Sequence, residues 1–207
     1  MKARHYNAMA VSACAATLPM LAHAHHAMDN ELPGTPLEGL LSGLAHPIVG
    51  IDHLLFVLAI GATCFYFGQR AGAVAAFLGA ALAGTVVHLY RATLPYPDAW
   101  VALSLVVLGV LIWRAAPMLR SKAVTAFFAL AGIAHGYAYG ESIVGAEQTP
   151  LFAYLAGYTL VQLLVVLAGY ALASLADRKH SSPIGVKAVG GALSVAGVAF
   201  LLLGFAA

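Results

Sequence analysis

The sequence predicts an all-α membrane protein, a bundle of six transmembrane helices that follows a cleavable signal peptide. Of the 207 residues, 62% are hydrophobic and only 9% are charged. A soluble domain is about half apolar and a quarter charged, so this chain lacks the polar residues needed to cover a water-facing surface. Its apolar residues fall into six stretches, and each is close to the roughly 20 residues that cross a hydrocarbon core about 30 Å thick.

The N-terminus has the order of a secretory signal peptide. Lys2 and Arg4 precede a short apolar run over residues 8–21, and Ala22-His23-Ala24 fits an A-x-A cleavage site. The apolar run is too short for an ordinary span, although an uncleaved first helix is the alternative. The expected parts are a signal peptide, a periplasmic N-terminal segment and a six-helix transmembrane domain: 1–24, 25–45 and 46–207.

Glycine, proline and charged residues separate the six expected spans. In chain order these spans are 46–67, 71–90, 99–117, 122–140, 151–174 and 185–206. Pro47 favours a helix start, which places His46 at or just before the first turn. Gly132, Gly136 and Gly140 repeat every fourth residue, so the fourth span can approach another helix closely. That helix belongs either to the same chain or to a second copy in a homo-oligomer.

The basic residues indicate the orientation in the membrane. With an exported N-terminus, only Arg91 among the loop cations faces outward, and the other seven face inward. This bias is the positive-inside pattern, so we expect a bacterial inner-membrane protein with a periplasmic mature N-terminus. Carboxylates such as Asp98 and Glu147 lie on the outer side, where an acidic surface would gather cations. The alternative is that these carboxylates simply follow from the topology.

Ionisable residues inside the expected spans indicate a metal site. The chain has nine His and eight acidic residues, and five such groups fall in the outer half of the membrane: His46, Asp52, His53, His88 and His135. Groups of this kind are costly in lipid and mark function. Imidazole and carboxylate suit borderline divalent ions such as nickel, cobalt, zinc and copper. Asp52 is either a ligand or an acceptor that orients a ligating His.

The spacing within the first span separates two of these groups. His46 and His53 are seven residues apart and share one helix face. On a regular helix, the rise of about 1.5 Å per residue puts them too far apart along the axis to bind one ion together. We therefore expect His46 to meet the ion first, and Asp52 with His53 to belong to a deeper site.

Residues 46–53, His-Pro-Ile-Val-Gly-Ile-Asp-His, resemble the HPxxGxDH signature of the HupE/UreJ family of nickel and cobalt permeases. These permeases accompany hydrogenase and urease gene clusters. Asp98 stands six residues before Ser104, and this pair resembles a Glu and a Ser that the family typically has at the same spacing. Residues 134–141 resemble the family's HGxAHGxE segment. Tyr139 replaces the second His of that segment, and the fifth span lacks the His expected near Val166. The resemblance implies six spans and an exported N-terminus.

The function expected from these observations is secondary transport of a divalent metal ion, nickel or cobalt, into the cytoplasm. The ion would supply a metalloenzyme such as hydrogenase or urease. The expected metal ligands are His46, Asp52, His53, His88, His135 and Glu141, with Asp98 and Glu147 as outer acidic residues. We expect no enzymatic activity and no prosthetic group, and no Walker A sequence is present for ATP. The expected partners are the ion and the lipid bilayer, with no nucleic acid.

Two other classes of function use the same residues. A membrane haem or electron-transfer protein would use two His at matched depth, such as His53 and His135, as axial ligands. An intramembrane metal-dependent hydrolase would hold zinc with three protein ligands and leave one position open for water. Asp52, His88 and Ser104 extend the choice of groups for the hydrolase, although the chain has no HExxH motif.

Overall fold

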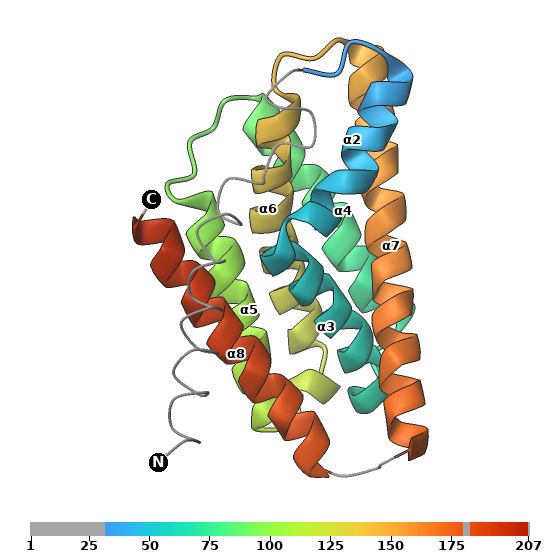
Figure 1. Ribbon diagram of the computed structural model, residues 1–207, viewed down its shortest axis with the longest axis vertical. Helices are drawn as coiled ribbons and strands as arrows, with labels where there is room; N and C mark the ends of the chain where they lie inside the picture. The colour runs from blue at the N-terminus through green and yellow to red at the C-terminus, as the bar shows by residue number, and fades with distance from the viewer. Residues whose placement is uncertain (1–31, 180–182, 207) are drawn as a thin grey trace, which may run out of the picture.

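The computed structural model describes residues 32–179 and 183–206, and the regular structure in these ranges is entirely helical (Figure 1). The expected signal peptide lies outside the described residues. Seven α-helices and two short 3-10 helices follow in order: α2 (Pro36–Val49), α3 (Ile51–Phe67), α4 (Ala71–Leu89), α5 (Pro97–Trp113), η2 (Pro117–Arg120), α6 (Ala123–Gly140), η3 (Glu141–Ile143), α7 (Gln148–Lys179) and α8 (Pro183–Ala206). Each of the six expected apolar stretches therefore falls mostly on helix, with breaks at Gly50 and at residues 114–116.

The first helix begins earlier than the sequence prediction placed it. Thr35 caps α2: its hydroxyl accepts a hydrogen bond from the Glu38 N–H at 3.2 Å, and the Glu38 carboxylate accepts one from the Thr35 N–H at 3.1 Å. With Pro36 at the first helical position, this capping box is a complete start signal. The prediction of a helix start at Pro47 is wrong, because Pro47 lies inside α2 close to its end.

A sharp break at Gly50 divides the first expected span into α2 and α3. The two helices are bent by 79° at this residue, which has the extended dihedrals φ −71° and ψ 96°. The Gly50 N–H donates to the His46 carbonyl at 3.2 Å, and the Gly50 carbonyl accepts from the Leu54 N–H at 2.9 Å. Gly50 thus closes α2 and starts α3, and the chain changes direction within one residue.

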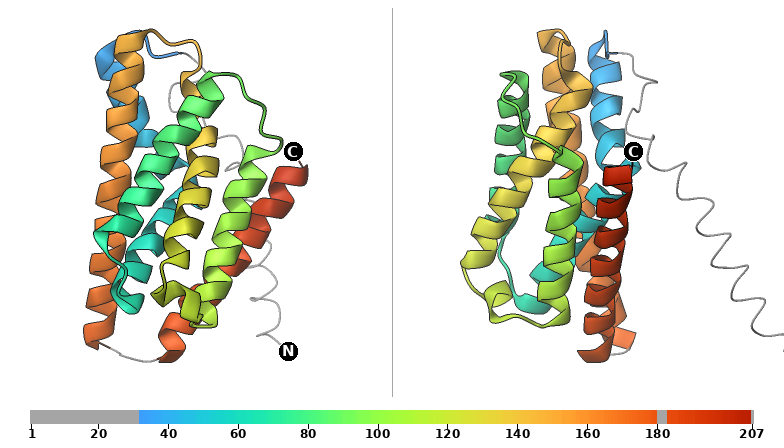
Figure 2. Two further views of the ribbon diagram at one scale, coloured as in Figure 1. Left: turned by 180° about the vertical axis from the view of Figure 1, so that it is seen from behind. Right: turned by 90° about the vertical axis from the view of Figure 1, so that its left-hand side faces the viewer.

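The bundle consists of three groups of closely packed helices. α2 and α3 lie along the long helix α7, α4 lies against α6, and α5 lies against α8 (Figures 1 and 2). Glycines make the α4–α6 contact: a Cβ on Gly136 would collide with the Ala81 carbonyl, and one on Gly132 with the Phe77 carbonyl. The glycine repeat of the fourth expected span therefore serves packing within the chain.

Length and composition mark several of these helices as membrane-crossing candidates. Within the described ranges, three helices meet both criteria: Ala71–Leu89, Gln148–Arg178 and Ile184–Phe205. The bent pair α2 and α3 adds a fourth if it counts as one span, and α5 is a shorter apolar helix. Leu130, Leu164 and Leu202 are among many large apolar side chains that point outward. A surface of this kind suits lipid better than water.

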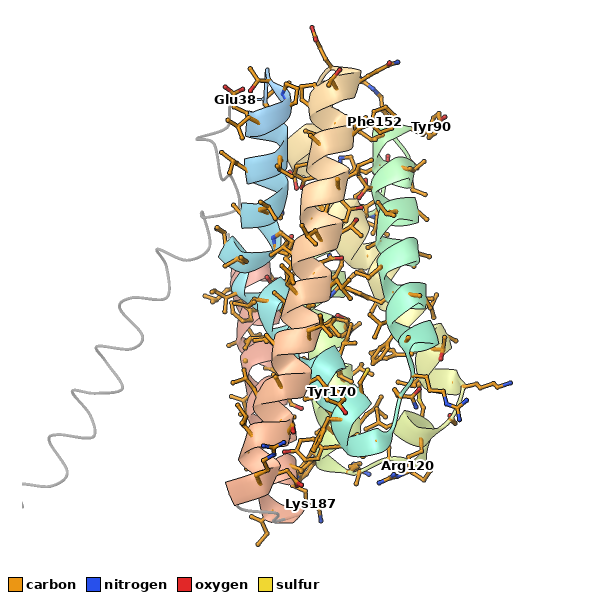
Figure 3. The ribbon with its side chains drawn as sticks, turned by 90° about the vertical axis from the view of Figure 1, so that its right-hand side faces the viewer. Glu38, Tyr90, Arg120, Phe152, Tyr170 and Lys187 are labelled. Atoms are coloured by element: carbon orange, nitrogen blue, oxygen red, sulfur yellow. The ribbon has the colours of Figure 1, made fainter. Side chains whose placement is uncertain are left out.

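Charged side chains mark the two ends of the bundle. Glu38 lies at one end, and Arg120 and Lys187 both lie at the opposite end (Figure 3). Between the two ends, the core has an apolar part rich in phenylalanine and a polar part that contains predicted histidines. Phe56, Phe77 and Phe128 are fully buried in the apolar part, and the histidines predicted from the first and fourth spans lie beside it.

Candidate metal site

Three of the predicted histidines converge from three helices. His46 comes from the end of α2, His53 from the first turn of α3 and His135 from α6, and all three are at least 95% buried. The Nδ1 atoms of His53 and His135 are 3.0 Å apart, and the ring centroids of His46 and His53 are 6.1 Å apart. These residues, with Asp52, form a buried polar group that we call the histidine cluster.

The break at Gly50 brings His46 and His53 together. On a regular helix, residues seven apart lie about 10 Å apart along the axis. The sequence prediction separated the two histidines on the assumption of a regular helix. The 79° bend breaks that helix and removes the separation. A Cβ on Gly50 would stand 2.7 Å from the Cδ2 atom of His53. Only glycine leaves room for this ring.

Asp52 supports the first turn of α3. Its carboxylate accepts a hydrogen bond from the backbone N–H of His53 at 2.9 Å, and the side chain is 6% exposed. The N-terminus of a helix has unpaired N–H groups and a positive dipole end, so a carboxylate is stabilising there. Asp52 therefore places negative charge beside the His53 backbone at the start of α3.

The hydrogen bonds of Ser104 assign the tautomers of two histidines. The Ser104 hydroxyl donates to the Val101 carbonyl at 2.7 Å, so at 3.1 Å it accepts from the Nε2–H of His135. A neutral His135 then has its lone pair on Nδ1 and accepts the proton of the His53 Nδ1–H. It follows from this network that His53 has its lone pair on Nε2, the form in which that atom can bind a metal ion.

Aromatic and hydroxyl groups surround the histidine cluster. The Tyr139 ring lies 5.1 Å from the ring of His46 and 4.6 Å from that of His53. The Ser142 hydroxyl is 2.9 Å from Nδ1 of His46, and the Phe56 ring packs 4.6 Å from His135. Hydroxyl oxygens therefore line one side of the cluster, and an apolar wall closes another.

The remaining predicted residues lie elsewhere. The His88 ring packs 4.3 Å from the Tyr137 ring, and no ring contact joins it to the histidine cluster in the described part of the chain. Asp98, Glu141 and Glu147 are exposed on or beside the segments that join the helices. They are available to solvent cations, but they are not brought into the cluster.

The cluster is not a complete ligand set in this conformation. Within residues 32–179 and 183–206, no three His, Cys, Asp or Glu side chains are placed so that they could hold one metal ion. A bound ion would therefore draw further ligands from hydroxyl groups or water, or from a rearrangement of the imidazoles.

Comparison with known proteins then decides the family. A family model described as HupE / UreJ protein matches residues 12–200. The chain belongs to the HupE/UreJ family. Protein HupE from Rhizobium leguminosarum bv. viciae is 27% identical over 199 residues, which cover 95% of this chain and 98% of that protein. No solved structure matches the chain.

Membership of the HupE/UreJ family gives the fourth-span motif a register that the sequence analysis missed. Counted from His135, the Glu of HGxAHGxE falls at position 142, where this chain has Ser142, and Glu141 stands one residue earlier. The structure agrees with this count, because Ser142 contacts His46 whereas Glu141 is exposed. Strict spacing from His135 was the signal that would have identified Ser142.

Proposed function

We propose that this HupE/UreJ protein is a secondary transporter that carries a divalent transition metal ion, nickel or cobalt, into the cytoplasm. The ion would supply the maturation of a metalloenzyme such as a hydrogenase or urease, the systems with which the family is associated. The observation that carries the proposal is the convergence of His46, His53 and His135 from three helices in one buried cluster. Such groups are costly in an apolar bundle, so their presence indicates a function.

The proposal includes six membrane crossings, with α2 and α3 together as the first. It places the protein in the bacterial inner membrane, with the mature N-terminus in the periplasm after removal of residues 1–24. The positions of charged residues support this orientation, since Glu38 lies at one end of the bundle and Arg120 and Lys187 lie at the other (Figure 3). Basic residues concentrate on the cytoplasmic side of inner-membrane proteins.

The path of the ion follows the positions of the polar groups. Asp98, Glu141 and Glu147 on the surface would raise the local concentration of cations. His46, with Ser142 beside it, would meet the ion before His53 and His135. The buried Phe56, Phe77 and Phe128 close the way onward, so release to the cytoplasm requires these helices to move. Binding must also be weak enough for the ion to leave.

The geometry favours transport over haem binding. The facing nitrogens of His53 and His135 are in hydrogen-bond contact at 3.0 Å, which leaves no space for a porphyrin plane between them. It also gives little support to a zinc hydrolase with three protein ligands. No three His, Cys, Asp or Glu side chains in the described residues are placed so that they could hold one ion.

Metal accumulation in cells that lack their own nickel and cobalt uptake tests the proposal. Cells expressing the wild-type protein should accumulate more of one of these ions than cells without it. Asp52→Asn and His53→Ala should abolish the gain at equal membrane expression. Thr63→Val is a matched control, because Thr63 is also fully buried but its hydroxyl donates within its own helix, to the Ala59 carbonyl. Accumulation that survives both site substitutions would disprove the proposal.

A further inference from the structure

Two fully buried side chains near the histidine cluster have polar atoms without partners. Tyr139 on α6 and Gln162 on α7 are both 0% exposed. The Tyr139 hydroxyl and both amide atoms of Gln162 have no hydrogen-bond partner in the described part of the chain. Buried polar groups are nearly always hydrogen-bonded to protein or to ordered water, and the cost of leaving them unpaired is greatest where bulk water is absent.

The two side chains belong to one location. The Gln162 amide is near enough to the Tyr139 hydroxyl to act on it as a hydrogen-bonding group, although the two side chains do not have the geometry of a formed hydrogen bond. The Asp52 carboxylate and the Tyr158 hydroxyl also act on the Tyr139 hydroxyl electrostatically. The Tyr139 ring is in contact with the rings of His46 and His53. The unpaired atoms therefore lie between α6 and α7, on the side of Tyr139 that is directed toward Gln162 and within electrostatic reach of Asp52.

Neighbouring hydroxyls on the same helix are satisfied by the protein. Tyr154 donates to the Tyr139 carbonyl at 2.8 Å. The hydroxyl of Tyr158 is 3.1 Å from that of Thr85, which also reaches the Gly136 carbonyl at 2.8 Å. On α7 the missing partners are thus confined to Gln162, so they do not reflect loose packing of this helix as a whole. Apart from Tyr139 and Gln162, Nδ1 of His88 on α4 is the remaining buried side-chain atom without a partner among the described residues.

The unpaired atoms need a ligand that both donates and accepts. The Gln162 amide presents one acceptor and two donor hydrogens, and the Tyr139 hydroxyl is both donor and acceptor. A bare cation would satisfy the oxygens but not the amide N–H groups. Water satisfies all of them, and two to four polar partners are what a buried water molecule requires.

We propose that Tyr139 and Gln162 form a buried water site, and that its water supplies an oxygen ligand to a divalent cation at the histidine cluster. The second half of this inference rests on the proposed transport function, whereas the first half does not. It accounts for a cluster in which no three His, Cys, Asp or Glu side chains of the described residues are placed so that they could hold one ion. The water joins the cluster to α7, which contributes no imidazole in its described residues.

Hydroxyl-radical labelling by X-ray radiolysis tests the water site in the full-length protein, because radicals form from bound water and oxidise the side chain beside it. Tyr139 should be labelled despite its burial. Tyr154, equally buried but bonded to a carbonyl, serves as the internal reference and should be labelled at least about tenfold less. Gln162→Leu should reduce labelling of Tyr139 about tenfold, whereas Thr63→Val should leave it unchanged. An unlabelled Tyr139, or equal labelling in Gln162→Leu, would overturn the water site.

Cobalt binding tests the ligand role, with Co²⁺ alone as the probe and the purified protein in lipid nanodiscs. Loss of a group that orients a metal ligand usually lowers affinity about 10–100-fold. Tyr139→Phe and Gln162→Leu should each raise the Kd for Co²⁺ at least about tenfold, with Thr63→Val as control. A Kd that stays within about twofold would overturn the ligand role. If the wild type does not bind Co²⁺, the titration is repeated with Ni²⁺. If it binds neither ion, both the ligand role and the transport proposal fail, and the labelling result still decides the water site.

Discussion

The residues that contact the histidine cluster include several that carry no charge. Ser104 sets the tautomer of His135, and through it that of His53, by accepting the Nε2–H hydrogen bond. Tyr139 covers His46 and His53, and Ser142 contacts His46. The search for ionisable residues at membrane depth predicted the histidines but could not detect these groups, since serine and tyrosine are common in helices without any functional role.

We predict that Ser142 matters more to ion binding than Glu141 does. Ser142→Ala removes the contact to His46, and a typical hydrogen bond contributes about 0.5–1.5 kcal/mol, or a two- to tenfold loss of affinity. Glu141→Ala removes an exposed carboxylate, whose effect is screened by salt. Isothermal titration of Ni²⁺ or Co²⁺ into both variants, at about 0.15 M salt, measures the ranking. The reverse ranking would make Glu141 a ligand after all.

At the scale of the helices, Gly50 determines the geometry of the cluster. Gly50 ends α2 and begins α3, and the 79° bend between them turns two residues on one face of a helix into neighbours around one site. The sequence signature His-Pro-Ile-Val-Gly-Ile-Asp-His thus combines a histidine at a helix end, a glycine at the break and an acid at the next helix start. The spacing of the signature therefore matches the end of α2, the break and the start of α3.

We predict that Gly50→Ala disrupts ion binding through His53. The added Cβ would meet the His53 ring at 2.7 Å, so the ring or the break must shift. Overpacking of this kind costs about 1–3 kcal/mol, and it should appear both as a lower Tm and as a loss of Co²⁺ affinity of at least about fivefold. Thermal unfolding and cobalt titration in detergent measure the two effects.

Gly79→Ala is the matched control for this prediction. Gly79 lies within α4, and a Cβ placed there would meet no atom within 4 Å. The substitution should leave both Tm and Co²⁺ affinity close to those of the wild type. A Gly50→Ala protein that binds Co²⁺ as tightly as Gly79→Ala would show that the position of His53 does not depend on the missing side chain.

At the scale of the whole molecule, three helix groups enclose one polar cluster and one apolar wall. The glycine-mediated contacts let the backbones of α4 and α6 approach closely. His135 on α6 meets His53 on α3. Phe56, Phe77 and Phe128 fill the core beside the cluster. Buried apolar side chains therefore enclose the cluster on that side.

We predict that the two ends of the bundle face opposite sides of the membrane. In a protein with Cys14→Ala and Cys64→Ala, Glu147→Cys should react with a membrane-impermeant maleimide in intact spheroplasts. Ser121→Cys should react only after the membrane is permeabilised, because its loop also holds Arg120 and Lys122. Both residues are exposed in the structure. Labelling of Ser121→Cys in intact spheroplasts, with Glu147→Cys protected, would reverse the proposed orientation.

Composition and hydrophobic stretch length determined the helical class, the apolar character of most helices and the polar residues among them, because these properties depend on local sequence and on the cost of polar groups in lipid. Only the tertiary structure decided which of the predicted histidines lie together in one site. His46 and His53 meet through the bend at Gly50, His135 on α6 meets His53 on α3, and His88 turns toward Tyr137 instead. Such contacts depend on how distant helices pack, and helical periodicity carries no information about a break or about which helix will be the neighbour.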